Sequence, residues 1–332
     1  MKALHRNRLL HGSAFAAGCI LLVMLISSAG VQPFLRTLSR LSPAAIAAAL
    51  ALYCVVWLLR TMRLSRFISH RGEAIRAADL FRMHIASYAL NSILPAKLGD
   101  AALAGVLAAR GFSLGSAAAV VLQMRIQDIM AVIICIIPSL FMIAEKDMPS
   151  WIVTLMLVCL ALAAVPIVTL LLDRKQRIGD LLMQAEKSFG HRIVKMAALQ
   201  THEAYKASQA MVFDGKLMSS TGVLSLLIWI FEGLTAYAVA IALGISLPFF
   251  AVTGAMAMAN AGKGIIAVPG GIGVHESIFS GMLVLLGTPL ESAVALAFLD
   301  HMLKKSFNML IGFPAAAALG MDSKTAKSVT PS

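Results

Sequence analysis

The chain has 332 residues, of which 59% are hydrophobic and only 13% are charged. Soluble globular domains carry about 25% charged residues, so this composition excludes an ordinary soluble enzyme. The net charge of +12 comes from 28 basic and 16 acidic residues, which lie in short clusters between long apolar runs. That distribution is typical of a multi-pass membrane protein, and no nucleic-acid partner is expected.

Apolar runs long enough to cross a bilayer recur along the chain. About twenty apolar residues span the hydrocarbon core. The basic start followed by the first run is also the pattern of a signal peptide, but the run is long enough for an uncleaved first helix, which we expect. We predict about six full spans, at residues 12–31, 43–59, 116–143, 151–172, 219–243 and 290–319.

Two basic stretches, residues 60–82 and 173–216, separate these runs. Their apolar residues recur at helical spacing, which predicts amphipathic helices lying on the membrane surface. The positive-inside rule places both stretches in the cytoplasm, together with the N and C termini. The basic side of 173–216 either binds anionic lipids or only sets the orientation of the chain.

Two further segments, residues 83–110 and 249–286, must begin and end on one side of the membrane if the neighbouring spans are correct. Each consists of two short apolar arms around a break, at 94–99 and at 268–273. At ~1.5 Å per residue one arm crosses about half of the ~30 Å hydrocarbon core. We therefore predict two re-entrant helical hairpins, the first entering from the cytoplasm and the second from outside.

The two halves of the chain resemble each other. Placing Gly111 on Gly287 without gaps pairs Ser116 with Ser292 and Arg125 with His301. We predict an all-α polytopic membrane protein with an inverted-topology repeat, the alternative being chance agreement among small residues. The expected organisation is a single transmembrane domain over 1–332, with a first repeat at about 43–143, cytoplasmic interfacial helices at about 173–216 and a second repeat at about 217–320.

Charged side chains at membrane depth cost a few kcal/mol each, so they are candidates for function. Lys97, Arg125 and Lys263 could bind a phosphate, with backbone N–H groups at the glycine breaks as further donors. The carboxylates could hold these cations, accept a cationic head group or take up protons. The predicted substrate-binding residues are Asn91, Pro95, Lys97, Gly99, Asp100, Arg125, Asp128, Lys263, Pro269, Gly270, Gly271, Gly273, Glu276, Asp300 and His301.

Several of these side chains could have a purely structural role instead. Arg125 and Asp128 are three residues apart on one helix and could simply neutralise each other. Lys304 and Lys305 could extend to the membrane surface, His301 could be a packed core residue, and Asn91 could bond across helices. The cysteines lie singly in apolar runs, so no metal site, disulfide or cofactor is predicted, and no catalytic motif is present.

Three motifs carry a resemblance to a known family: Asn91-Ser-Ile-Leu-Pro-Ala-Lys-Leu-Gly-Asp100, Gln123-Met-Arg-Ile-Gln-Asp128 and Val268-Pro-Gly-Gly-Ile-Gly-Val-His-Glu276. With them the chain resembles the flippase-like family that is also named for the transmembrane region of lysylphosphatidylglycerol synthase. The resemblance covers nearly the whole chain, and the Pro-Gly-Gly-x-Gly-x-x-Glu stretch is its most specific part. Met124 and residues 101–105 depart from the family pattern, in which an acidic residue and an arginine are common.

The resemblance implies a multi-pass protein of the bacterial inner membrane that moves a polar or anionic-headed lipid, a phospholipid or a polyprenyl-phosphate-linked glycan, between leaflets. By position, the family's Pro, basic residue, Gly and Asp correspond to Pro95, Lys97, Gly99 and Asp100. The alternatives are a membrane-embedded enzyme and an accessory subunit for lipid or lipid-linked sugar synthesis. The expected partners are the lipid itself and either a second copy of the chain or a lipid-modifying enzyme.

Overall fold

A computed structural model describes residues 2–39, 41–72, 74–94, 97–143, 150–173, 177–188, 192–265 and 268–328. Every element in these ranges is a helix. Three helices are long and apolar enough to cross a membrane, Pro43–His70, Leu114–Met142 and Gly215–Ala242. The count is up to four if Phe15–Ala29 and Val31–Leu38, which meet at 91°, form one broken span. The chain is thus an all-α protein, and three or four of the six expected spans meet this criterion.

The first half of the chain forms helices at nearly all the predicted places. Ser42 caps α3, because its Oγ accepts a hydrogen bond of 3.2 Å from the Ala45 N–H, and Pro43 occupies the first helical position. The helices are α1 (Lys2–Ala29), α2 (Val31–Leu38), α3 (Pro43–His70), α4 (Ala77–Ile93), α5 (Leu98–Ala108) and α6 (Leu114–Ile143).

One prediction in this half is wrong. The basic stretch 60–82 is not a separate surface helix, because α3 continues without interruption to His70. Arg60 and Arg63 lie inside the protein with only 5% and 1% of their surface exposed. Both pair with buried carboxylates on other helices, described below, and an isolated helix would leave these charges without partners.

The second half begins at α7 (Ser150–Leu172) and divides the basic stretch 173–216 between two helices, α8 (Arg177–Ser188) and α9 (Arg192–Phe213). It then follows the same order as residues 43–143: a long helix, a hairpin with a break, and a second long helix. These elements are α10 (Gly215–Ala242), α11 (Phe249–Ile265), the 3-10 turn η1 (Pro269–Gly271), α12 (Val274–Leu285) and α13 (Leu290–Ser328).

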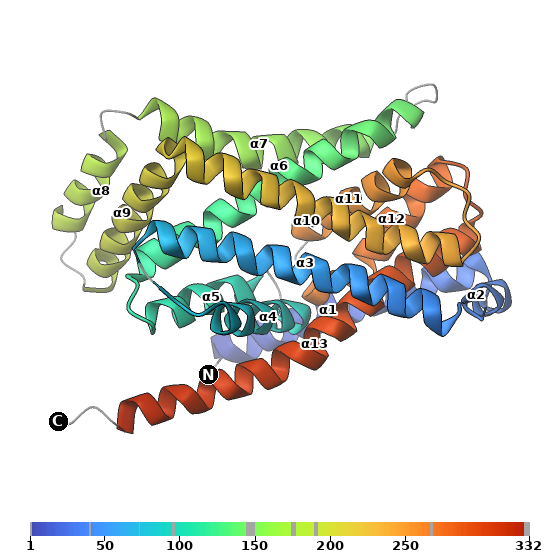
Figure 1. Ribbon diagram of the computed structural model, residues 1–332, viewed down its shortest axis with the longest axis horizontal. Helices are drawn as coiled ribbons and strands as arrows, with labels where there is room; N and C mark the ends of the chain where they lie inside the picture. The colour runs from blue at the N-terminus through green and yellow to red at the C-terminus, as the bar shows by residue number, and fades with distance from the viewer. Residues whose placement is uncertain are drawn as a thin grey trace.

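The long helices of the two halves run in opposite directions. In Figure 1, α3 and α10 lie side by side and antiparallel along the long axis, and α6 runs opposite to α13. Each hairpin packs on the long helix of the other half, α4 on α13 and α11 on α6. Glycines permit both close approaches, since a Cβ at Gly312 would lie 2.5 Å from the Ile85 carbonyl oxygen and one at Gly254 2.1 Å from Ser139 Oγ.

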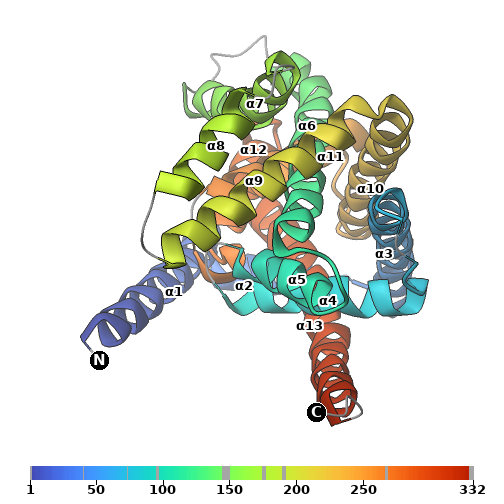
Figure 2. The ribbon, with the colours of Figure 1, turned by 90° about the vertical axis from the view of Figure 1, so that its left-hand side faces the viewer.

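The start of α1, the end of α13 and the pair α8 and α9 all lie toward one end of the molecule (Figures 1 and 2). Helix α9 is joined to α6 there, because the Gly115 N–H donates a 2.7 Å hydrogen bond to Gln200 Oε1. That the termini and the 173–216 helices share one side of the membrane stays a prediction, and so does the assignment of that side to the cytoplasm.

Candidate functional site: a charged cavity between the hairpins

A cavity of about 560 Å³ lies between the two hairpins and the long helices. Its lining contains six Lys or Arg side chains and three Asp or Glu side chains, so the cavity carries an excess of positive charge: Arg60, Lys97, Arg125, Lys263, Lys304 and Lys305 against Asp128, Glu232 and Asp300. Nine of the predicted residues line it: Asn91, Lys97, Arg125, Asp128, Lys263, Gly270, Gly271, Asp300 and His301.

A first ion-pair network joins α3, α5 and α6. Arg125 binds Asp100 in bidentate fashion, with Nε–Oδ2 at 2.6 Å and Nη2–Oδ1 at 2.5 Å. Its Nη1 also lies 3.3 Å from Asp128 Oδ2, while Arg63 Nη1 lies 2.5 Å from the other oxygen of Asp128. Arg125 does contact Asp128 as predicted, but its closer partner is Asp100. It is therefore engaged by two carboxylates, which makes it a poorer phosphate ligand than we predicted.

Asn91 joins the two arms of the first hairpin. Its Nδ2 donates to Asp100 Oδ1 at 2.8 Å, and its Oδ1 accepts from the Gly99 N–H at 2.8 Å. Gly99 is needed because a Cβ there would lie 2.0 Å from the Ser87 carbonyl oxygen. Asn91 therefore bonds across the hairpin, as its structural alternative predicted, and it also lines the cavity. The predicted residue Pro95 lies outside the described residues.

Lys97, the residue before α5, has the left-handed conformation, with φ of 54°. Among the described residues it is the one non-glycine residue with positive φ. Such strain costs of order 1–3 kcal/mol and persists only where the surroundings impose it. A Cβ at Gly264 would lie 3.3 Å from Lys97 Nζ, so this amine reaches from the first hairpin to the last turn of α11 in the second.

A second network joins α3, α10 and α13 through Glu232. Its carboxylate lies 2.6 Å from Arg60 Nη2 and 2.9 Å from Lys304 Nζ. Lys304 also lies 2.7 Å from Asp300. The alternative in which Lys304 extends to the membrane surface is wrong, because Lys304 is 8% exposed and lies between two carboxylates. The Arg60 guanidinium also lies 4.4 Å from the centre of the Tyr88 ring, a cation–π distance.

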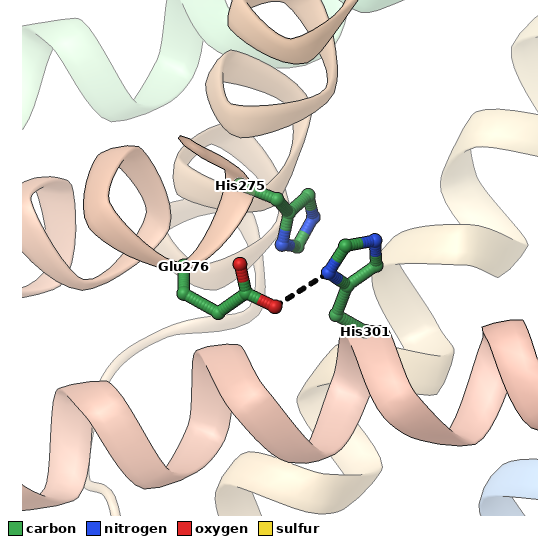
Figure 3. A group of neighbouring side chains, drawn as sticks. All are labelled: His275, Glu276 and His301. Carbon is green, nitrogen blue, oxygen red and sulfur yellow. Dashed lines mark hydrogen bonds and ion pairs between the residues drawn. The ribbon is translucent and has the colours of Figure 1, made fainter. Parts of the chain in front are cut away.

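A third cluster lies where α12 begins beside α13 (Figure 3). Glu276 Oε2 accepts a 2.7 Å hydrogen bond from the Gly273 N–H, which fixes the start of α12. Its Oε1 lies 2.6 Å from His301 Nδ1. The His275 ring stacks on the His301 ring with centroids 4.3 Å apart. His301 is thus packed in the core, as its structural alternative predicted, yet it also lines the cavity with His275.

Two contacts of the first half have counterparts at similar places in the second half. The register that places Arg125 on His301 also places Asp100 on Glu276 and Asp128 on Lys304. Asp100 contacts Arg125, and Glu276 contacts His301. Asp128 and Lys304 each pair with the long helix before the hairpin, with Arg63 on α3 and Glu232 on α10. In the Lys304–Glu232 pair the charges are therefore exchanged relative to the Asp128–Arg63 pair.

The remaining lysines of the cavity differ in their surroundings from the paired cations. Neither Lys263 nor Lys305 forms an ion pair with a residue in the described ranges, although both line the cavity. A Cβ at Gly270 would lie 2.8 Å from Lys305 Nζ, and one at Gly271 2.9 Å from Lys263 Cβ. Both lysines therefore lie against the glycine break of the second hairpin, whose glycines leave room for their side chains. Pro269 and Gly273 also lie in this break. Pro269 is buried, and Gly273 is the residue before α12.

Sequence reasoning missed Arg60, Arg63 and Glu232. The two arginines were assigned to a surface helix because they follow an apolar run. Glu232 had a clear signal, since it is the one charged residue between 217 and 262, and a lone acid in an apolar span is a functional candidate.

The fold and the cavity define a class, a multi-pass helical membrane protein with an internal charged site. Residues 10–312 match the family described as the lysylphosphatidylglycerol synthase TM region, and the chain belongs to that family. It is 24% identical over 357 residues to "Glycosyltransferase AglD" of Haloferax volcanii, covering 97% of this chain and 57% of that protein. It is also 24% identical over 317 residues to "UPF0104 membrane protein PH1989" of Pyrococcus horikoshii, covering 89% and 93%.

Proposed function

We propose that the protein moves a lipid with an anionic head group between the leaflets of a bacterial inner membrane. The observation that carries the proposal is that Lys97, Lys263 and Lys305, from both hairpins and α13, border one cavity. A phosphate or other anion could pair with Lys263 and Lys305 without breaking the ion pairs of Arg125 and Glu232. The excess of basic over acidic lining residues supports an anionic rather than a cationic ligand.

The correspondence of the two halves supports an inverted repeat of six spans and two re-entrant hairpins. In such transporters the substrate site lies near the bilayer midplane between broken helices, and one repeat moves against the other to alternate access. Here each hairpin packs on the long helix of the other half. A relative movement of the hairpins would therefore open the cavity to one side and close it to the other.

A second candidate function is an enzyme, or an accessory subunit, for the synthesis of lipid-linked sugars. It is favoured by one observation, the name of the relative AglD as a glycosyltransferase. This chain spans 57% of the length of AglD, so the shared part need not carry that protein's activity. An enzyme changes the chemistry of its lipid, whereas a flippase changes only the leaflet in which the lipid lies.

One experiment distinguishes lipid transport from enzymatic activity. The purified protein is reconstituted into liposomes of bacterial lipid extract that contain traces of fluorescent lipids with anionic, zwitterionic or glycosylated phosphate head groups. Protein-dependent exchange between leaflets, fastest for the anionic lipids and without a new lipid species by mass spectrometry, is the expected result. A changed lipid species without exchange would replace transport by the enzyme function.

A further inference from the structure

We infer that His275, Glu276 and His301 form a binding site for a transition-metal dication of the zinc type. One nitrogen from each imidazole and one carboxylate oxygen lie within 4.8 Å of one another. Two histidines and one glutamate are a ligand set that zinc uses where it keeps a fourth position open. Imidazole nitrogen favours zinc, cobalt or nickel over magnesium or calcium, which prefer oxygen alone.

The second half of the chain has two histidines beside Glu276, His275 on α12 and His301 on α13, although a contact with the carboxylate alone needs one. In the first half the carboxylate of Asp100 is held by Arg125, and the residue before it is Gly99. The equivalent positions in the second half are Glu276, His301 and His275. A guanidinium can hold a carboxylate but cannot ligate a metal. The second half thus replaces a glycine and an arginine by two potential ligands around the same carboxylate.

One imidazole nitrogen of this cluster has unused bonding capacity. His275 Nδ1 is buried and has no hydrogen-bond partner among the described residues, and His275 and His301 are 1% and 2% exposed. Buried polar atoms are normally satisfied, so this orphaned nitrogen of His275 is open to a ligand. Both side chains also line the cavity, which leaves its space for a fourth ligand.

Binding requires a small rearrangement. The two rings are nearly parallel, with 27° between their planes, so their lone pairs do not point at one spot. Rotation of the His275 ring about its side-chain bonds would bring its nitrogen toward the carboxylate, as ligands at about 2.0–2.2 Å from zinc require. The metal would displace the proton of the 2.6 Å hydrogen bond between Glu276 Oε1 and His301 Nδ1, and that proton would be released to solvent.

Nearby charge decides what fills the fourth position. Lys304 and Lys305 lie about one helical turn beyond His301, and Lys263 also borders the cavity. These ammonium groups repel a dication, so an anion at the fourth position offsets the repulsion. We expect phosphate to strengthen metal binding, and this dependence does not require that the protein transports lipid.

The test uses the full chain, purified in detergent with any affinity tag removed and stripped with a chelator. Titration with Co²⁺, followed by its visible absorption and by displacement with Zn²⁺, measures the number of ions bound and their coordination. We expect one ion per chain, with at least tenfold weaker binding in His275→Ala and His301→Arg. Inorganic phosphate should tighten binding to the wild type.

The variants separate a ligand from a structural residue. His301→Arg keeps a cation opposite Glu276, as Arg125 does opposite Asp100, so this variant should fold and still lose the metal. If it does not elute as a monodisperse protein, His275→Ala decides, because the equivalent position in the first half is Gly99. His70→Ala, which changes a histidine on α3 that pairs with Asp214, should bind normally. Absence of binding to the wild type, or binding that survives in the His275→Ala/His301→Arg double variant, would overturn the site.

Discussion

Replacing Glu232 with alanine tests the ion-pair network most severely. Glu232 is only 7% exposed and contacts both Arg60 and Lys304. Without it, Lys304 keeps Asp300 at 2.7 Å, but Arg60 loses its one ion pair within the described ranges. Removing one partner of a buried pair costs about 3–5 kcal/mol. Because Lys304 stays paired, we expect about 3 kcal/mol, which corresponds to a fall in melting temperature of about 6–12 °C at roughly 2–4 °C per kcal/mol.

The assay is thermal unfolding in detergent micelles, followed by tryptophan fluorescence. Asp180→Asn, which changes an exposed carboxylate on α8, is the control and should stay within about 0.5 kcal/mol of the wild type. The Arg60→Met/Glu232→Met double variant should recover much of the loss, since apolar replacement of a buried pair is often neutral. A fall of less than about 2 °C for Glu232→Ala would refute the assignment of Glu232 as the anchor of Arg60.

Three further predictions follow from individual contacts. Gly99→Ala should prevent the first hairpin from closing, because its Cβ would lie 2.0 Å from the Ser87 carbonyl oxygen; little or no folded protein on size-exclusion chromatography is expected, and normal yield would contradict this. Asp128→Lys should destabilise the protein, and adding Arg63→Glu should restore at least half of the lost melting temperature. The reason is that Lys304 and Glu232 form a pair of the same kind with the charges exchanged. No recovery in the Asp128→Lys/Arg63→Glu double variant would count against the equivalence of the two pairs. The hydrogen bond from the Leu217 N–H lowers the pKa of Asp214 below its ordinary value of 3.8. The Asp214 carboxylate therefore stabilises the folded state above pH 3.8, and this stabilisation is lost as the pH falls through the lowered pKa. The melting temperature of Asp214→Asn should fall less in acid than that of the wild type, and identical dependence of the two melting temperatures on pH would contradict this.

The sequence predicted the helices well because apolar length and glycine breaks are local signals. The break of the first hairpin follows from residues 94–99, and helices α4 and α5 end and begin beside it. The prediction failed at α3 because a run of arginines looks the same whether it faces water or buried acids. Only the fold brings Glu232, which lies 172 residues away, against Arg60.

The sequence indicated many of the residues that line the cavity, but only partly what each of them contacts. Lys97 and Lys263 were chosen from charge at membrane depth, and both line the cavity. Arg125 was assigned to the ligand as well, although Asp100, 25 residues earlier, already binds it. Pairing of this kind depends on how the hairpin folds back, and the spacing of Asp100 and Arg125 in the sequence does not determine it.

The central claim is that lysines from both hairpins bind the anionic head group of a lipid that the protein moves. The most direct measurement compares leaflet exchange of a fluorescent anionic phospholipid in proteoliposomes of the wild type, Lys97→Ala, Lys263→Ala and the control Lys206→Ala, which changes an exposed lysine on α9. We expect leaflet exchange to fall at least tenfold in the two cavity variants, with normal folding, and to be unchanged in the control. Exchange at the wild-type rate in well-folded Lys97→Ala and Lys263→Ala would contradict it.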